Sequence, residues 1–248
     1  MEIVILAGGK GTRMGDQTKE IPKPMICIGN KPILLHIMDY YLRWGATKFI
    51  ICCGYKQEYI KQYFEKLCKN SEQVDDITTR TIYEKKDVLL IDTGIDTGTA
   101  GRIATCIKYI EENNFYLTYG DGLSDVDISK LTKEHLISAR DITLSAVNPQ
   151  ERFGIIQFDG DNKVIDFQEK SKRTDVWING GFMIVDRKVF NHIREDDVSF
   201  EYDVLPRLVK EGVVGAYKHY GFWQCMDTED EKKKLEHICR QEKKPWLK

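Results

Sequence analysis

The sequence lacks the long apolar run that a membrane-spanning helix requires. Its longest apolar stretches, such as Phe49–Cys53 and Val88–Ile91, are far shorter than the roughly 20 residues that cross a bilayer. The N-terminus also lacks the basic region and the small-residue cleavage site of a secretory signal peptide. We therefore expect a cytoplasmic protein that does not bind membranes.

An excess of charge of one sign is missing too. The 37 basic and 39 acidic residues give a formal net charge of −2, so no overall field attracts a polyanion. No basic stripe with interleaved aromatic residues is present either. We expect no nucleic-acid partner.

Cysteine and histidine lack the spacing of a metal or nucleophile site. The seven cysteines are odd in number, form no CxxC pair and lie mostly in apolar segments. This usage is typical of a reducing compartment, where cysteine serves as a small hydrophobic residue. The five histidines are scattered, and no GxSxG motif occurs. A zinc site and a covalent Ser/His or Cys/His mechanism are therefore disfavoured.

Short apolar strands alternate with amphipathic helices in the first half of the chain. Strands are predicted at Glu2–Leu6, Lys48–Cys53, Val88–Ile91 and Phe115–Tyr119, and helices at Asn30–Trp44, Gln57–Cys68 and Thr99–Glu112. Asn30 is the expected cap of the first helix. Such alternation requires crossover connections, which implies a mostly parallel sheet with helices on both faces.

The second half changes character, because predicted strands follow one another closely. Strands are expected at Ile142–Ala146, Gly154–Phe158, Lys163–Gln168 and Trp177–Val185, and helices at Asp186–Ile193, Phe200–Glu211 and Thr228–Arg240. We expect a mixed sheet that shares one core with the first half. The apolar pair Trp246 and Leu247 should dock on the body or on a neighbouring subunit.

A glycine-rich loop follows the first strand. Its sequence is Ala7-Gly8-Gly9-Lys10-Gly11-Thr12-Arg13, and three glycines let backbone N–H groups approach an anion closely. The carboxyl edge of an α/β sheet is where ligands bind. The spacing fits neither the dinucleotide fingerprint nor the Walker loop, so the loop either binds phosphate in another geometry or is a plain tight turn.

A second cation lies in a stiff segment shortly afterwards. Lys23 stands between Pro22 and Pro24, which fix the backbone and lower the cost of ordering the lysine. A rigid cation near a glycine loop suits a phosphate group, whereas a solvated loop lysine is the alternative.

These two motifs resemble those of the sugar nucleotidyltransferases, and further matches extend over the whole chain. They are Cys52–Lys56, Asp92–Gly94, Tyr119–Gly122, Arg152–Gly154, Phe167–Lys170, Ile178–Phe182, Gly221–Gln224 and Met226–Thr228. In combination they look most like the glucose-1-phosphate cytidylyltransferase branch of that family.

The resemblance implies one α/β domain over residues 1–248. Its mostly parallel central sheet would be flanked by helices in a Rossmann-like, GT-A-like nucleotidyltransferase fold, with a mixed acceptor-binding second half. The nucleotide-binding half would span about 1–125 and the acceptor-binding half about 126–248. We expect a homo-oligomer.

The resemblance also implies the roles of individual residues. Catalytic cations would be Arg13 and Lys23, and Mg²⁺ would be held by Asp121 and Asp227, which are hard oxygen ligands. The nucleotide would contact Leu6, Ala7, Gly8, Gly9, Gly11, Thr12, Arg13, Thr97, Arg102 and Gly120. The acceptor would contact Glu169, Lys170, Asn179 and Gly180. Taken singly, Asp121 reads equally well as a turn residue and Asp227 as a helix cap, and Asp125 and Asp127 read as caps of the following helix.

The expected reaction is transfer of a cytidylyl group from CTP to a phosphorylated small molecule, with glucose 1-phosphate as the first choice of acceptor. Ser171 replaces the proline that usually follows Lys170 in the family, so the acceptor is the least constrained part of the prediction. A different sugar, polyol or amino-acid phosphate is one alternative. A catalytically silent nucleotide-sugar sensor is another.

Overall fold

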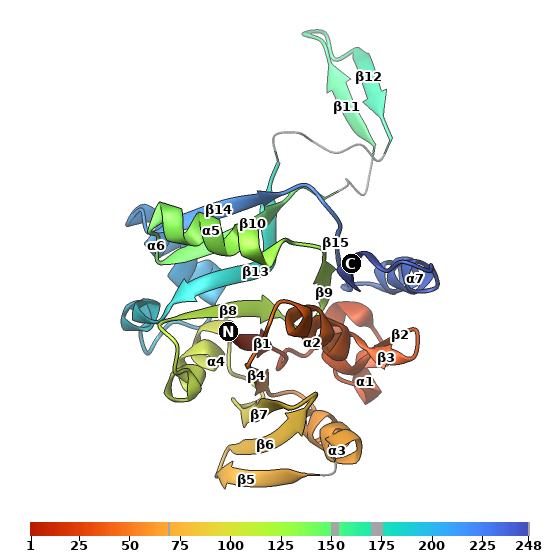
Figure 1. The fold of residues 1–248 in the computed structure, drawn as a ribbon. Coiled ribbons are helices and arrows are strands. Elements are labelled where there is room, and N and C mark those ends of the chain that lie inside the picture. Colours follow the sequence, from red (N-terminus) through yellow and green to blue (C-terminus); the bar gives the residue numbers. More distant parts are fainter. Residues whose placement is uncertain (69, 150–153, 170–175, 248) are drawn as a thin grey trace.

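The computed structural model describes residues 1–68, 70–149, 154–169 and 176–247. Its centre is a nine-stranded sheet in the order β14-β10-β13-β8-β1-β4-β7-β6-β5 (Figure 1). The strands in chain order are β1 (Glu2–Leu6), β4 (Lys48–Cys53), β5 (Ser71–Asp75), β6 (Thr78–Tyr83), β7 (Lys86–Asp92), β8 (Asn114–Tyr119), β10 (Ile142–Val147), β13 (Ile178–Asp186) and β14 (Val214–His219).

The middle of the sheet is parallel, and its two sides are mixed. Strands β8, β1, β4 and β7 run in the same direction, whereas β6 is antiparallel to β7 and β13 is antiparallel to both β8 and β10. The expected parallel core, with a mixed second half and flanking helices, is therefore present, and the first half adds an antiparallel edge through β6 and β5. Because β13 starts where β8 ends, residues from both halves of the chain meet at one edge.

Two apolar clusters cover the two faces of the sheet. In β1, Ile3 and Ile5 face a cluster with helices α2 (Ile33–Arg43) and α3 (Gln57–Cys68), and Val4 faces a cluster with α4 (Thr99–Cys106) and α6 (Leu205–Lys210). Strand β1 is buried along its whole length because helices lie on both of its faces. Figure 1 shows α3 and α4 on opposite sides of the strands.

A small antiparallel ladder lies beside the main sheet. Strand β9 (Gly122–Ser124) pairs with β15 (Trp223–Cys225), and α7 (Glu229–Cys239) follows. Thr228 caps α7 in a reciprocal capping box with Glu231. Helix α5 (Ile128–Ser138) is capped by the side chain of Asp127, as expected, and the short helix α1 (Gln17–Glu20) follows the glycine loop.

Several expected boundaries were wrong. Asn30 does not cap the first helix, because it lies in the turn between β2 (Cys27–Ile28) and β3 (Lys31–Pro32), and α2 starts only at Ile33. The expected helix from Thr99 ends at Cys106 and continues as a 3-10 turn. The edge hairpin β5–β6 was not predicted, because its sequence is largely polar.

Two further expectations concern the second half and the C-terminus. Strands β11 (Ile155–Phe158) and β12 (Val164–Gln168) form a separate two-stranded sheet that stands away from the body in Figure 1, so the expectation of one shared core was wrong for them. Trp246 is buried and its indole N–H donates to His36, so it docks on the body. None of the described helices is both long and apolar enough to cross a membrane.

Candidate active site

A cleft of about 1250 Å³ opens at the carboxyl ends of the central strands. It lies where the chain order reverses between β1 and β8, which is the point at which open α/β sheets bind ligands. The loop after β1 forms one wall, and Gly120 and Asp121 after β8 form the floor beside it. The volume exceeds that of a typical single-ligand pocket and accommodates two small substrates.

The glycine loop is shaped by close contacts at its start and end. A Cβ atom on Gly8 would lie 2.1 Å from a guanidinium nitrogen of Arg102, so only glycine fits there. Gly11 has a φ of +63°, a left-handed conformation that glycine adopts without strain, and a Cβ there would lie 3.0 Å from Lys23. Glycine at these two positions therefore lets the loop approach Arg102 and Lys23 more closely than any other residue type would allow.

Arg102 is a buried hub beneath this loop. Its guanidinium donates hydrogen bonds to the Thr93 hydroxyl and to four backbone carbonyls, those of Gly8, Cys53, Gly94 and Ile95. These acceptors lie at the carboxyl ends of the neighbouring parallel strands β1, β4 and β7 or just after them, so one side chain ties the three strand ends together. Burial lowers the pKa of Arg102, although thiols and a carboxylate nearby oppose this. The arrangement adds a structural role to the predicted nucleotide contact.

Lys23 lies between two carboxylates at the floor of the cleft. Its Nζ is 2.6 Å from Asp121 Oδ2 and 2.5 Å from Asp227 Oδ1, and its side chain is only 10% exposed. Arg13 Nη1 approaches the other oxygen of Asp227 at 3.0 Å. Burial opposes the charge on Lys23, but the two carboxylates outweigh burial and raise its pKa. Burial would likewise raise the pKa of Asp227, but Lys23 and Arg13 hold it below its ordinary value.

The ladder between β9 and β15 brings the two carboxylates together, although they are more than one hundred residues apart. Cys225 pairs with Gly122, and the Met226 N–H donates to the Asp121 carbonyl at 2.9 Å. Because Thr228 caps α7, the Asp227 carboxylate is not consumed as a cap and remains in the cleft.

Asp125 closes the far end of this ladder. The expectation that it caps α5 was wrong, because its carboxylate accepts from the Phe222 N–H at 2.6 Å and lies 3.1 Å from His219 Nε2. A Cβ on Gly221 would lie 2.3 Å from the same oxygen. Asp125 therefore holds the turn that leads into β15.

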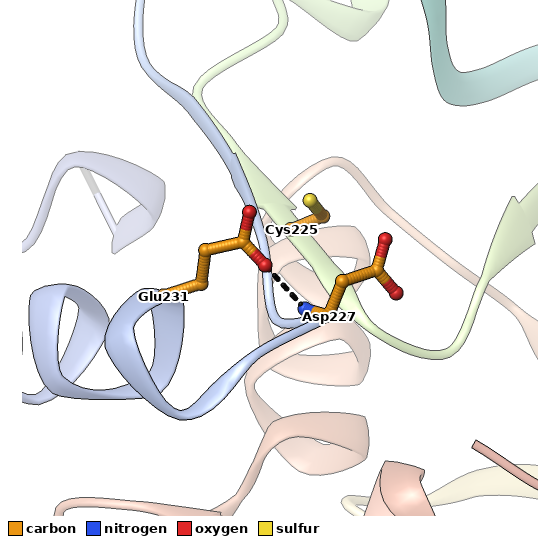
Figure 2. Close-up of side chains that lie close together, drawn as sticks. All are labelled: Cys225, Asp227 and Glu231. Atoms are coloured by element: carbon orange, nitrogen blue, oxygen red, sulfur yellow. Dashed lines mark hydrogen bonds between the residues drawn. The ribbon is translucent and has the colours of Figure 1, made fainter. Parts of the chain in front are cut away.

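The cleft contains a set of side chains that suit a divalent cation. Cys225, Asp227 and Glu231 offer ligand atoms within 4.8 Å of one another (Figure 2), and Asp121 shares Lys23 with Asp227. Glu231 is partly engaged, since it accepts from the Asp227 N–H at 2.7 Å. Burial, with Glu231 and Asp227 nearby, raises the pKa of the Cys225 thiol to about 12, so the hard carboxylate oxygens are the better ligands for Mg²⁺.

The start of β13 forms the side of the cleft that contains the predicted acceptor contacts. Asn179 donates through Nδ2 to the Tyr119 hydroxyl at 3.2 Å and accepts from the Gly181 N–H, and the Gly180 carbonyl accepts from the Trp223 indole at 2.8 Å. Glu169, at the end of β12, is not among the residues that line the cleft. Lys170 lies outside the described residues.

Nearly all of the residues that the sequence singled out line this one cleft. They are Leu6, Ala7, Gly8, Gly9, Gly11, Thr12, Arg13, Lys23, Thr97, Arg102, Gly120, Asp121, Asn179, Gly180 and Asp227. Sequence reasoning missed the lining residues Glu201 and Cys225. Cys225 could have been predicted, because it ends a strand two residues before the predicted ligand Asp227. For Glu201, no local sequence pattern indicated a place in the cleft.

Comparisons with known proteins agree with this geometry. Residues 2–228 match the nucleotidyl transferase family. The chain is 39% identical to the glucose-1-phosphate cytidylyltransferase of Salmonella typhi over 99% of this chain and 98% of that protein. It is 33% identical to a Campylobacter jejuni D-glycero-alpha-D-manno-heptose 1-phosphate guanylyltransferase over 81% of this chain and 83% of the relative. The crystal structure of HddC from Yersinia pseudotuberculosis complexed with GMP-PN superimposes with a TM-score of 0.70 at 28% identity, covering 96% of this chain and 99% of that one.

Proposed function

The chain belongs to the nucleotidyl transferase family, and from this membership we propose that it transfers a cytidylyl group from CTP to glucose 1-phosphate. The products would be CDP-glucose and pyrophosphate. The observation that carries the proposal is the near-complete overlap between the site residues predicted from the sequence and the lining of one cleft.

The proposed chemistry is an in-line displacement at the α-phosphorus of the triphosphate. A phosphate oxygen of the acceptor forms a new bond to that phosphorus, the bond to the bridging oxygen of the β-phosphate breaks, and pyrophosphate leaves. Such a reaction depends on positioning and charge neutralisation more than on a protein nucleophile.

The chain's own cations supply the neutralisation in this proposal. Arg13 in the glycine loop and Lys23 at the floor of the cleft would face the triphosphate, and the backbone N–H groups of the loop would add further donors. Asp121 and Asp227 would hold Mg²⁺, which lowers the negative charge that the phosphates present to each other. Two carboxylates that already share one ammonium group are close enough to share a cation.

The acceptor would occupy the side of the cleft formed by β13. Asn179 is held in place by Tyr119, and the backbone at Gly180 is fixed by Trp223, so both present a rigid surface to a sugar ring. Glu169 and Lys170 remain predicted acceptor contacts, with Lys170 as the partner of the acceptor phosphate.

A matrix of the four nucleoside triphosphates against many phosphorylated acceptors tests the proposal. Pyrophosphate release in the presence of Mg²⁺ should be fastest with CTP and glucose 1-phosphate. Faster release with CTP and another phosphate would leave cytidylyl transfer standing and overturn the choice of acceptor. Binding of nucleotide without release from any pair would favour the sensor alternative.

A further inference from the structure

One carboxylate in the cleft has no role in the proposed chemistry. Glu201 lies in the π-helical turn Phe200–Val204 of the second half and lines the cleft. Such turns are rare and occur often at functional sites. Resting on the proposed function, we propose that Glu201 determines specificity by accepting a hydrogen bond from a hydroxyl group of a bound substrate.

The hydrogen bonds of Glu201 leave room for one more donor. The Tyr119 hydroxyl donates to Oε1 at 2.7 Å, and the hydroxyls of Thr99 and Ser199 donate to Oε2 at 2.6 Å and 3.0 Å. An ionised carboxylate has about four acceptor positions, and these three donors from the described chain fill most of them. The position left over lies on Oε1, and it suits an O–H or N–H donor.

The side chain is held rigidly by its neighbours. Thr99 Oγ1, which donates to Glu201, also accepts from the Phe200 N–H at 2.8 Å, so the turn and the start of α4 are tied to each other. The Ala100 N–H donates to the Val198 carbonyl in the same contact. A group fixed in this way loses little freedom when a ligand binds, which is the condition for sharp discrimination.

Tyr119 stays a donor to this carboxylate. Burial and the neighbouring Glu201 raise the pKa of Tyr119 above its ordinary value, so its hydroxyl keeps its proton. The same oxygen accepts from Asn179, which leaves its proton directed to Glu201. The network therefore links Glu201 to the predicted acceptor side as well as to α4.

Charge decides which part of a substrate can lie beside Glu201. A carboxylate repels phosphate, whereas Arg13 and Lys23 elsewhere in the cleft attract it. A substrate that places its phosphates near the cations can offer hydroxyl groups to Glu201. Two sources carry such hydroxyls, namely the ribose of the nucleotide and the ring of the acceptor, and the network contacts both sides through Thr99 and Asn179.

Deoxy analogues of both substrates test the proposal. We would measure kcat/KM for the wild-type enzyme, Glu201→Gln and the control Ser199→Ala, using CTP against 2′-deoxy- and 3′-deoxy-CTP, and glucose 1-phosphate against its 2-, 3-, 4- and 6-deoxy forms. Ser199→Ala removes one donor to Oε2 of Glu201, but it keeps the charge of Glu201 and the remaining acceptor position on Oε1. Thermal unfolding of each variant shows whether it is folded.

The wild type should discriminate against at least one analogue by about 10-fold to 100-fold, the range for a hydrogen bond to a charged group. Glu201→Gln should bring that ratio close to one, whereas Ser199→Ala should retain it. If Glu201→Gln loses discrimination among the CTP analogues, the hydroxyl belongs to the ribose. If it loses discrimination among the glucose 1-phosphate analogues, the hydroxyl belongs to the acceptor. Unchanged ratios for every analogue in folded Glu201→Gln would overturn the proposal.

This outcome is separable from failure of the proposed function. If the wild type releases no pyrophosphate from CTP with glucose 1-phosphate, the proposed function fails first. The same deoxy comparison would then use the nucleotide and acceptor that the substrate matrix identifies, and the same two outcomes would decide the role of Glu201.

Discussion

Replacing Lys23 with methionine should both disable the enzyme and expose a latent cation site. The lysine side chain is 10% exposed and contacts Asp121 and Asp227 at 2.6 Å and 2.5 Å. Methionine keeps much of the buried stem but removes the charge. Loss of one preorganised charge at a reacting phosphate should lower kcat by about 10²-fold to 10³-fold.

The effect on stability follows from the same geometry. Unit charges about 4 Å apart attract by about 4 kcal/mol at an effective dielectric constant of about 20, and desolvation of the ions offsets much of this. Asp121 and Asp227 are 29% and 23% exposed, so water screens them once the lysine is gone. We expect a loss of about 2 kcal/mol, which lowers Tm by about 4–8 °C in a chain of this size.

Magnesium should behave differently in the variant. The freed carboxylates repel each other and no longer compete with an ammonium group for a cation, so Mg²⁺ should raise the Tm of Lys23→Met more than that of the wild type. Lys10→Met is the control, because Lys10 is a lysine of the nearby glycine loop that is 54% exposed and pairs with Asp96. Differential scanning fluorimetry with and without Mg²⁺, together with pyrophosphate release, measures both effects. Turnover within about threefold of wild type, or an equal loss in Lys10→Met, would contradict the role assigned to the charge of Lys23.

Three other outcomes are expected. Gly8→Ala should raise the KM for CTP about 10-fold or more, since its Cβ would lie 2.1 Å from Arg102, whereas Gly9→Ala, with nothing within 4 Å of its Cβ, should change it far less in the same assay. Arg102→Lys should lower the free energy of unfolding by about 2–4 kcal/mol in urea titrations, because an ammonium group cannot reach all of the carbonyls that the guanidinium satisfies. The pKa of Asp227 is lowered in the folded state, so its contribution to stability should be complete above the ordinary value of 3.8 and lost as the pH falls through the pKa of the folded state. The pKa of Lys23 is raised, so its contribution should be complete below 10.5 and lost as the pH rises through the pKa of the folded state. The stability difference between wild type and Lys23→Met, measured by urea unfolding from pH 3 to 9, should therefore be flat from about pH 5 to 9 and shrink below about pH 4.

Local patterns in the sequence predicted the parallel core well. Strands such as β1 and β4 are nearly continuous apolar runs, because a parallel strand covered by helices on both faces needs apolar side chains on both sides. The glycine loop and Lys23 were predicted because consecutive residues, namely the closely spaced glycines and the two prolines beside Lys23, determine the local backbone conformation. The edge hairpin β5–β6 has no such pattern, since its exposed side chains do not alternate with apolar ones clearly enough.

Contacts between distant segments were beyond local patterns. Asp125 reads as a cap in the sequence, but its carboxylate is taken by Phe222 and His219 from the other end of the chain. Glu201 likewise has an ordinary helical context, and only the tertiary structure brings it to Tyr119 and Thr99. The pairing of Asp121 with Asp227 was inferred from a family resemblance, because no spacing rule connects residues so far apart.

The short ladder between β9 and β15 joins the two ends of a long excursion of the chain. Residues 126–218 lie between β9 and β15 in the chain and supply Asn179, Gly180 and Glu201 to the cleft. Asp125 and its partners His219 and Phe222 fasten both ends of this excursion. Sequence changes inside the excursion can therefore reshape the proposed acceptor side, while the ladder keeps Asp121 and Asp227 in register. A one-residue slip of β15 would instead turn Asp227 away from Lys23, because side chains alternate along a strand. Evolution can therefore vary the residues that contact the sugar, whereas the three residue pairs that join β9 and β15 must keep their register.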